Sequence, residues 1–308
     1  MNSINLFKGY DSAFITGKIV ELPILNEEQF KDLTVDSEGN NIINYINYSL
    51  QFSTFYKFPY YTATNIDGLQ FKKVPRKDNW RKDPRIPKEL QFGKEFYTLP
   101  KSNFDRGHMA KREDVQWGNT IAIALNAADS TFYYTNAVPQ HKDLNRDIWR
   151  SLEDYILHTE TKKKELKINV YTGPILSSQN PYFVTPLDEV QVQIPVLFWK
   201  VVIFEKDDGN LYRAGFMMGQ SKLLIEDDII EILESDNDLF NEFADAETYQ
   251  VNVELIEELS GIDMPLAIDS YTDSRNIKLV LQEIDIDPDL ESFSDENELG
   301  FIIENLKL

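Results

Sequence analysis

Runs of β-branched and aromatic residues predict the strands of this chain. Residues 48–55 and 60–65 form two such runs, and an Asp-Gly pair at 67–68 suits the turn of a hairpin. Two further runs, 167–172 and 196–204, are rich in valine, isoleucine and aromatic residues. The pattern therefore predicts a core that contains a sheet.

Other segments have the spacing of short helices. Residues 120–129 and 255–259 fit helices, and Gly261 can end the second one as its C-terminal cap. Residues 225–233 are also predicted to be helical. A further helix is expected to begin near Asp147, whose carboxylate can cap the first turn.

Three stretches show no clear period. Residues 72–103, rich in proline, lysine and arginine, are interpreted as a long ordered loop. Residues 1–47 are polar and mixed, and we expect an N-terminal extension there. Residues 267–308 form an acidic C-terminal extension, either a strand with a short terminal element or a frayed tail. The domain that we expect between the two extensions covers residues 48–266.

Composition excludes several classes of protein. With 42% hydrophobic and 12% aromatic residues, the 308 residues can bury the core of one large domain or two modest ones. The chain has no cysteine, which excludes disulfides, thiolate zinc sites, iron–sulfur clusters and cysteine nucleophiles. No apolar run approaches the ~20 residues of a membrane helix, and the N-terminus lacks a signal-peptide pattern. We therefore expect a cytoplasmic protein with no membrane partner.

The charge is distributed unevenly along the chain. The formal net charge is −21. Residues 226–308 contain 25 acidic and 3 basic residues, whereas residues 71–112 contain 13 basic and 5 acidic residues. Because the local field decides what a groove attracts, the basic segment can serve a nucleic-acid site within an acidic protein.

The sharpest candidate for chemistry is the sequence Asp105-Arg106-Gly107-His108. It contains one of only three histidines, within the basic segment. A lone histidine is more often structural than catalytic, so its sequence context decides. Three neighbouring stretches supply that context: 75–83 (PRKDNWRKD), 134–140 (YTNAVPQ) and 144–153 (LNRDIWRSLE).

This ordered set resembles the DNA/RNA non-specific endonuclease family, the sugar-non-specific nucleases of the ββα-metal superfamily. Residues 193–201 and 249–261 are also similar to the family, so the resemblance covers about residues 48–265. It implies an α+β fold, with a mainly antiparallel central sheet flanked by helices and a ββα element over about 103–157. It also implies a metal-dependent endonuclease that hydrolyses DNA, with RNA as a further candidate substrate.

The resemblance assigns the central chemical roles. His108 is the general base that takes a proton from the attacking water. Asn145 is the one direct protein ligand of a Mg²⁺ ion, for which Mn²⁺ can substitute, and Glu153 holds the ion through water. Neutral imidazole suits a base near neutral pH, and Mg²⁺ retains water readily. Eight residues of straight helix would separate Asn145 from Glu153 by about 12 Å, so Asn145 is expected in the turn before the helix.

Arginines and an asparagine complete the expected site. Arg106 and Arg76 are expected to face the scissile phosphate, since guanidinium groups suit phosphate oxygens. Arg81 either contacts flanking phosphates or belongs to a solvated basic loop, and Arg85 has the same two interpretations. Asn136 is expected to help orient the site. Phosphate contacts carry no sequence information, so little base preference is expected.

One departure from the family leaves an alternative open. Where the family commonly has an arginine one turn after the glutamate, this chain has Leu157. Either another basic residue such as Arg150 compensates, or turnover is weakened. The alternative function is therefore a nucleic-acid-binding or inhibitory module that retains the nuclease fold. A homo-oligomer, or a regulatory partner bound through 1–47 or 267–308, is compatible with the sequence. The acidic region after Glu226 is better interpreted as a solubilising surface, and the alternative is that its carboxylates occupy the basic groove as a phosphate mimic.

Overall fold

The protein is described here from a computed structural model. The structure describes residues 7–142, 152–154, 156, 161, 165–230, 243, 247–283, 301–303 and 306–307. Within these ranges, no helix is long and apolar enough to cross a membrane.

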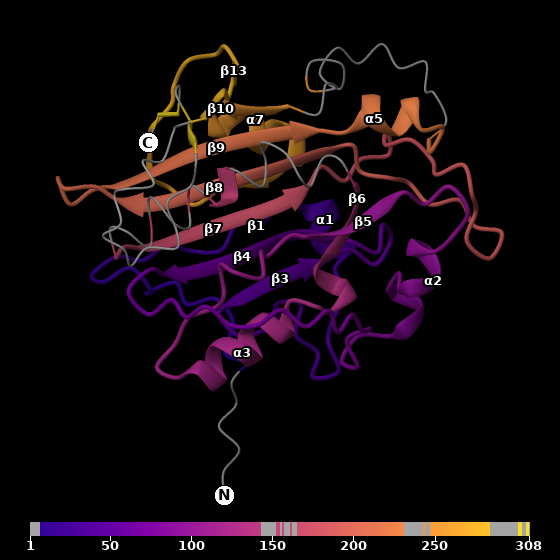
Figure 1. The fold of residues 1–308 in the computed structure, drawn as a ribbon, viewed down its shortest axis with the longest axis horizontal. Helices are drawn as coiled ribbons and strands as arrows, with labels where there is room; N and C mark the ends of the chain where they lie inside the picture. The colour runs from indigo at the N-terminus through magenta and orange to yellow at the C-terminus, as the bar shows by residue number, and fades with distance from the viewer. Residues whose placement is uncertain are drawn as a thin grey trace, which may run out of the picture.

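A nine-stranded sheet forms the centre of the molecule (Figure 1). Its strands follow the order β13-β10-β9-β8-β7-β4-β3-β2, and β12 pairs with β9. Every pairing is antiparallel except that of β12 with β9, which confirms the predicted α+β class with a mainly antiparallel sheet. The bounds are β2 Ile43–Asn44, β3 Tyr48–Phe52, β4 Pro59–Asp67, β7 Lys167–Pro174, β8 Leu197–Glu205, β9 Leu211–Gly219, β10 Thr248–Val251, β12 Ile268–Asp269 and β13 Ile277–Lys278.

The central strands are buried along most of their length, as a sheet covered on both faces requires. All nine residues of β4 and seven of the eight in β7 are buried. Helix α7 (Val253–Ser260) packs on β9, where a Cβ on Gly215 would meet Ile256 Cδ1 at 3.0 Å. Helix α3 (Ile121–Ser130) lies beyond β3, on the opposite side of the molecule from α7 (Figure 1).

A separate two-stranded ribbon carries the Asp-Arg-Gly-His sequence. Strand β5 (Phe104–His108) pairs with β6 (Ala137–His141), so that His108 faces Ala137 across the ribbon. Gly107 is required there because a Cβ would lie 2.2 Å from Gln140 Cδ. Residues 152–154, which follow the ribbon along the chain, are helical, so the described part of the ββα element has the predicted order.

The shorter elements lie around these two sheets. The helices are α1 Glu27–Lys31, α2 Lys94–Tyr97 and α5 Ser221–Glu226, with 3-10 turns at η1 Lys88–Leu90 and η2 Tyr134–Asn136. The remaining strand pairs are β1 Ile24–Leu25 with β11 Ile262–Asp263, and β14 Leu281–Glu283 with β15 Phe301–Ile303.

Most of the expected elements are present, with small shifts at their ends. The strands predicted at 48–55, 60–65, 167–172 and 196–204 correspond to β3, β4, β7 and β8. The helix predicted at 120–129 is α3, where Thr120 accepts a hydrogen bond from the Ile123 N–H. Gly261 ends α7 at φ +66°, as expected of a left-handed cap.

Three local predictions were wrong. The Asp-Gly pair at 67–68 forms no hairpin, because β4 lies between β3 and β7 and the Asp67 side chain instead accepts from Gln70 N–H. The helix predicted at 225–233 does not continue through its described part: α5 ends at Glu226, and Asp228 has a φ of +52°, which helical backbone does not allow, while residues 231–233 lie outside the described residues. The segment 72–103 was predicted to be loop throughout, but it includes the short helices η1 and α2.

The N-terminal residues are joined to the sheet. Strand β2, within the expected 1–47 extension, pairs with β3, and Phe14, Ile15 and Val20 are buried in the main core. The division of the chain at residues 47 and 266 stays a prediction.

Candidate active site

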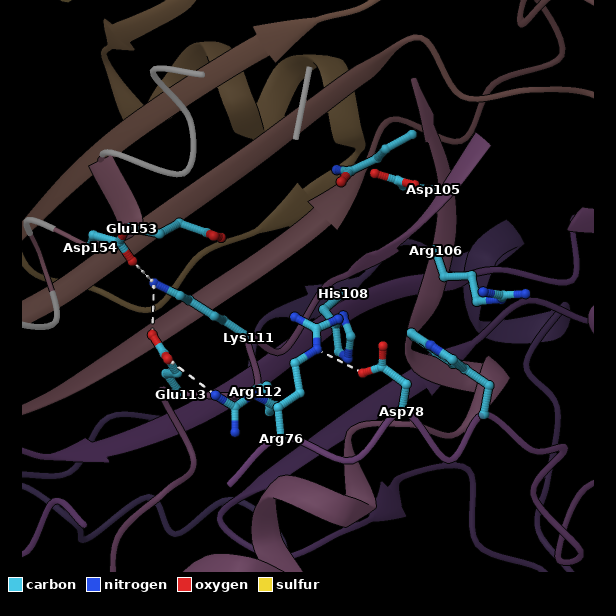
Figure 2. Close-up of a pocket in the computed structure, with 12 residues that line it drawn as sticks. Arg76, Asp78, Asp105, Arg106, His108, Lys111, Arg112, Glu113, Glu153 and Asp154 are labelled. Atoms are coloured by element: carbon cyan, nitrogen blue, oxygen red, sulfur yellow. Dashed lines mark hydrogen bonds and ion pairs between the residues drawn. The ribbon is translucent and has the colours of Figure 1, made fainter. Parts of the chain in front are cut away.

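A cleft of about 290 Å³ opens beside the end of β5. Figure 2 shows His108 at its centre, with arginine side chains around it and carboxylates along one wall. The lining residues are Arg76, Asp78, Trp80, Asp105, Arg106, His108, Lys111, Arg112, Glu113, Gln140, Glu153 and Asp154. They come from the loop before α2, from the β5–β6 ribbon, from the turn after β5 and from the helical residues 152–154.

His108 is held among aromatic rings. Its ring centroid lies 4.7 Å from that of Trp80 and 5.1 Å from that of Phe132. The Nε2 atom is buried and has no hydrogen-bond partner among the described residues. Burial, together with the charges of Arg76 and Arg112, lowers the pKa of His108 to about 3, and the charge of Asp78 acts weakly in the opposite direction. The imidazole is therefore neutral at physiological pH and can accept a proton.

Three arginines surround this imidazole, and each is held differently. Arg76 Nε lies 2.6 Å from Asp78 Oδ1 (Figure 2). The Arg106 guanidinium carbon lies 5.8 Å from the Trp80 ring and 5.4 Å from the ring of Tyr97. Arg106 Nε is buried with no hydrogen-bond partner in the described structure. A phosphate oxygen at that position would satisfy this donor.

The third arginine follows the base along the chain. Arg112 is half-buried at the cleft, donates to the Val74 carbonyl at 3.3 Å and lies 3.1 Å from Glu113 Oε1. Its charge is close enough to lower the pKa of His108. Arg112 therefore adds a cation that the sequence prediction missed, although it stands only four residues after the histidine.

Carboxylates and lysines form the opposite wall. Lys111 Nζ lies 2.5 Å from Asp154 Oδ1 and 3.9 Å from Glu113 Oε2 (Figure 2). Glu153, whose side chain is 10% exposed, lies 3.2 Å from Nζ of Lys200, which rises from strand β8 beneath the cleft. The wall is thus a set of ion pairs, of which the Lys200–Glu153 pair is the most deeply buried.

Asp114 is the buried carboxyl next to this wall. Burial raises its pKa to about 7, while Lys111 and Lys200 act in the opposite direction and Glu153 adds to the rise. For Lys111, in contrast, the neighbouring charges outweigh burial. Burial lowers the pKa of its ammonium group, but the carboxylates of Glu153, Asp114 and Asp154 raise this pKa overall. Acidic charge therefore predominates around the lysines.

Asn136 supports the site from behind and does not line the cleft. Its side chain is fully buried, accepts from the Ala110 N–H at 2.8 Å and donates to the carbonyls of Ala110 and Thr131. These bonds fix the chain just beyond His108, so Asn136 acts on the site by holding backbone.

The structure brings some of the expected residues together and separates others. His108, Arg106, Arg76 and Glu153 line one cleft. Arg81 does not line it: its guanidinium lies 2.6 Å from Asp129 and stacks on Tyr133 at 4.1 Å.

Other expected residues are bound elsewhere or lie outside the described residues. Arg85 is paired with the buried Asp83 at 2.7 Å. The predicted metal ligand Asn145, the cap Asp147, Arg150 and Leu157 all fall outside the described residues.

The described side chains suit a hydrated cation better than a fully chelated one. No group of three or more histidine, aspartate or glutamate side chains among them could hold a metal ion. One wall nevertheless presents the carboxylates of Glu113, Glu153 and Asp154, and oxygen is the donor that Mg²⁺ prefers. An ion that keeps most of its water fits this donor set.

Comparison with known proteins identifies similar chains. The sequence pattern of the DNA/RNA non-specific endonuclease family matches residues 26–270. The uncharacterised protein y4fB of Sinorhizobium fredii is 31% identical over 86% of this chain and 40% of its own length. A nuclease of Nostoc sp. is 28% identical over 70% of each chain. Human mitochondrial endonuclease G is 28% identical over 52% of this chain and 48% of its own length.

A solved structure shows the same fold. The crystal structure of the EndoG/EndoGI complex matches 72% of this chain and 84% of that chain, with a TM-score of 0.52 and 21% identity. The chain thus spans less than half the length of two of these curated relatives, and most of the length of the structural neighbour.

Proposed function

This chain belongs to the DNA/RNA non-specific endonuclease family, and we propose that it hydrolyses phosphodiester bonds of DNA and RNA with little sequence preference. The observation that carries this proposal is the position of His108, an unprotonated imidazole at the centre of a cleft lined by three arginines and an acidic wall. General-base chemistry on a phosphodiester needs a proton acceptor, groups that bind phosphate and a means of stabilising negative charge.

Each side chain has a defined part in the proposed reaction. His108 takes a proton from water while the water oxygen forms a bond to phosphorus. One P–O ester bond breaks, and the leaving oxygen takes a proton from solvent. Arg76, Arg106 and Arg112 bind the non-bridging oxygens, whose negative charge grows as the bond to water forms.

The metal belongs to the proposal as well. Family members depend on a metal ion, generally Mg²⁺, and we propose that Glu153 accepts hydrogen bonds from its water while Asn145, outside the described residues, binds it directly. Such an ion supplies positive charge that offsets the charge on the reacting phosphate.

A nicking assay tests this function. We expect the full chain to nick supercoiled plasmid with Mg²⁺ and not with excess EDTA. His108→Ala should lose nearly all turnover, by at least ~100-fold, because the proton acceptor is gone. It should still bind a labelled DNA duplex in fluorescence anisotropy, because the arginines remain.

The same assay distinguishes an active nuclease from the alternative function. A chain that binds nucleic acid but shows no metal-dependent cutting between pH 5 and 9 would be a binding or inhibitory module that retains the nuclease fold. Circular dichroism of His108→Ala controls for misfolding.

Control of the enzyme is part of the proposal. A nuclease without base preference endangers the nucleic acid of its own cell, so we propose a regulatory partner for a cytoplasmic form. The matched crystal structure contains an endonuclease in complex with an inhibitor. Within the described structure, no residue beyond Asp154 lines the cleft.

A further inference from the structure

Lys200 is a charged residue in the middle of a buried strand. It lies in β8 between Trp199 and Val201, which are fully buried, and only 2% of its own side chain is exposed. Burying a cation in an apolar sheet costs free energy unless the charge is paired and hydrogen-bonded. Its Nζ donates to Thr172 Oγ1 at 2.8 Å, across the β7–β8 pairing, and lies 3.2 Å from Glu153 Oε1.

This contact joins the sheet to the cleft. Glu153 lines the cleft from the helical residues 152–154, whereas Lys200 is not among the lining residues. Lys200 therefore reaches one wall of the cleft from beneath and has no surface for substrate. Among the residues that line the cleft, Lys200 contacts Glu153.

The next residue along the helix is held in the same way from another direction. Asp154 Oδ1 lies 2.5 Å from Nζ of Lys111, which comes from the turn after β5. Two consecutive carboxylates are thus each fixed by a separate lysine, one of them buried and the other partly buried. Stability alone does not require this arrangement, because apolar residues of similar volume often replace a buried ion pair at no loss.

We propose that Lys200 is a positioning residue for the cation site: it fixes Oε1 of the Glu153 carboxylate toward the sheet and leaves Oε2 to accept from metal-bound water. This inference rests on the proposed function, because it gives Glu153 its purpose. The charge of Lys200 replaces the stabilisation that Glu153 loses on leaving bulk water.

A double-mutant cycle on cation affinity tests the inference. The probe is Mn²⁺ added to the full chain without nucleic acid, measured by electron paramagnetic resonance of the free ion and by calorimetry. Lys200→Met removes the charge but keeps the length of the side chain. We expect it to weaken Mn²⁺ binding by about 10- to 100-fold, the effect typical of losing a group that supports a metal ligand.

Coupling to Glu153 is the decisive readout. Glu153→Gln alone should weaken Mn²⁺ binding to a similar extent, and the double variant should bind no more weakly than Glu153→Gln alone. Additive losses, or a Lys200→Met variant with a lower melting temperature but unchanged Mn²⁺ affinity, would overturn the inference and leave Lys200 as a structural residue.

Two controls keep the result interpretable. If Lys200→Met does not fold, Thr172→Val replaces it, because this change removes the hydroxyl oxygen that accepts the hydrogen bond from Lys200 Nζ. A weakening of Mn²⁺ binding by about 2- to 5-fold supports the inference, and unchanged binding overturns it. If the wild-type protein neither binds Mn²⁺ nor nicks plasmid, the proposed function is overturned. If the wild-type protein does both and Lys200→Met does both equally well, only this inference is overturned.

Discussion

At His108, burial and neighbouring charge act in the same direction. Both favour the neutral imidazole, and the pKa of about 3 lies far below the ordinary value of ~6.5. A histidine in this state is always ready to accept a proton at neutral pH. The low pKa makes it a weaker base, so the site depends on the arginines and the cation to stabilise the reacting phosphate.

The pH dependence follows from this pKa. We expect kcat/KM at fixed Mg²⁺ to show no rise from His108 between pH 6 and 8, because the free protein already carries neutral imidazole there. The rise that belongs to His108 should lie below pH 5. Arg112→Gln removes one of the charges that lower this pKa, so it should move the rise to higher pH. A single-proton rise near pH 6.5 in both proteins would contradict this account.

The same shift affects stability. An unfolded chain takes up a proton on His108 near pH 6.5, whereas the folded chain does so near pH 3. Between these values the unfolded state binds more protons, so the free energy of unfolding should fall as the pH is lowered through this window.

At the scale of elements, capping residues define where α7 begins and ends. Asn252 accepts from the Leu255 N–H at its start, and Gly261 adopts φ +66° at its end. Gly261 also meets the N-terminal region, since the amide of Asn26 donates to the Gly261 carbonyl at 3.2 Å. One cap therefore links α1 and α7, which are far apart along the chain.

A substitution at this cap should be costly. Gly261→Ala places a Cβ in the left-handed region and 2.7 Å from Asn26 Nδ2, so we expect a loss of about 1 to 2 kcal/mol in the free energy of unfolding. Urea denaturation followed by circular dichroism measures it. Glu258→Ala, an exposed change in the same helix, should stay within ~0.5 kcal/mol of wild type. Equal losses in the two variants would show that the cap geometry is unimportant.

At the scale of the whole molecule, the C-terminal region contributes to the sheet. Strand β12 pairs with β9, β13 pairs with β10, and the Asp269 carboxylate lies 2.6 Å from Arg213 Nε. The acidic region is therefore partly structural, where the sequence alone left open a strand with a short terminal element or a frayed tail.

Truncation should reveal this contribution. A chain that ends at Leu266 loses β12 and β13, and we expect its thermal unfolding midpoint to fall by several degrees. A chain that ends at Glu283 keeps both strands and serves as the comparison, although it loses β15 and the hydrogen bonds between Gln250 and Lys307. An unchanged midpoint in the shorter chain would mean that these pairings add little. Nicking at low salt by the chain that ends at Glu283 tests autoinhibition, because a gain in activity requires an inhibitory segment after residue 283.

The sequence alone determined the family, the strands of the central sheet and four residues that line the cleft, namely Arg76, Arg106, His108 and Glu153. Long buried strands leave a strong local pattern, and Asp105 to His108 are contiguous, so both can be found without a fold. The sequence also contained two weaker signals that we did not use. One was the Lys-Arg pair directly after the histidine region, and the other was a lysine in the middle of an apolar strand at 198–204.

Only the tertiary structure decided which charges act on the site. Arg81 carries the same guanidinium as Arg76, yet Asp129 holds it outside the cleft, whereas Lys200 lies 47 positions from Glu153 and contacts it. The pKa of His108 likewise depends on burial by Trp80 and Phe132 and on two arginines from separate loops. Desolvation and ion pairing depend on solvent exposure and on the distances between charges in the folded protein. The order of residues in the sequence contains neither of these quantities.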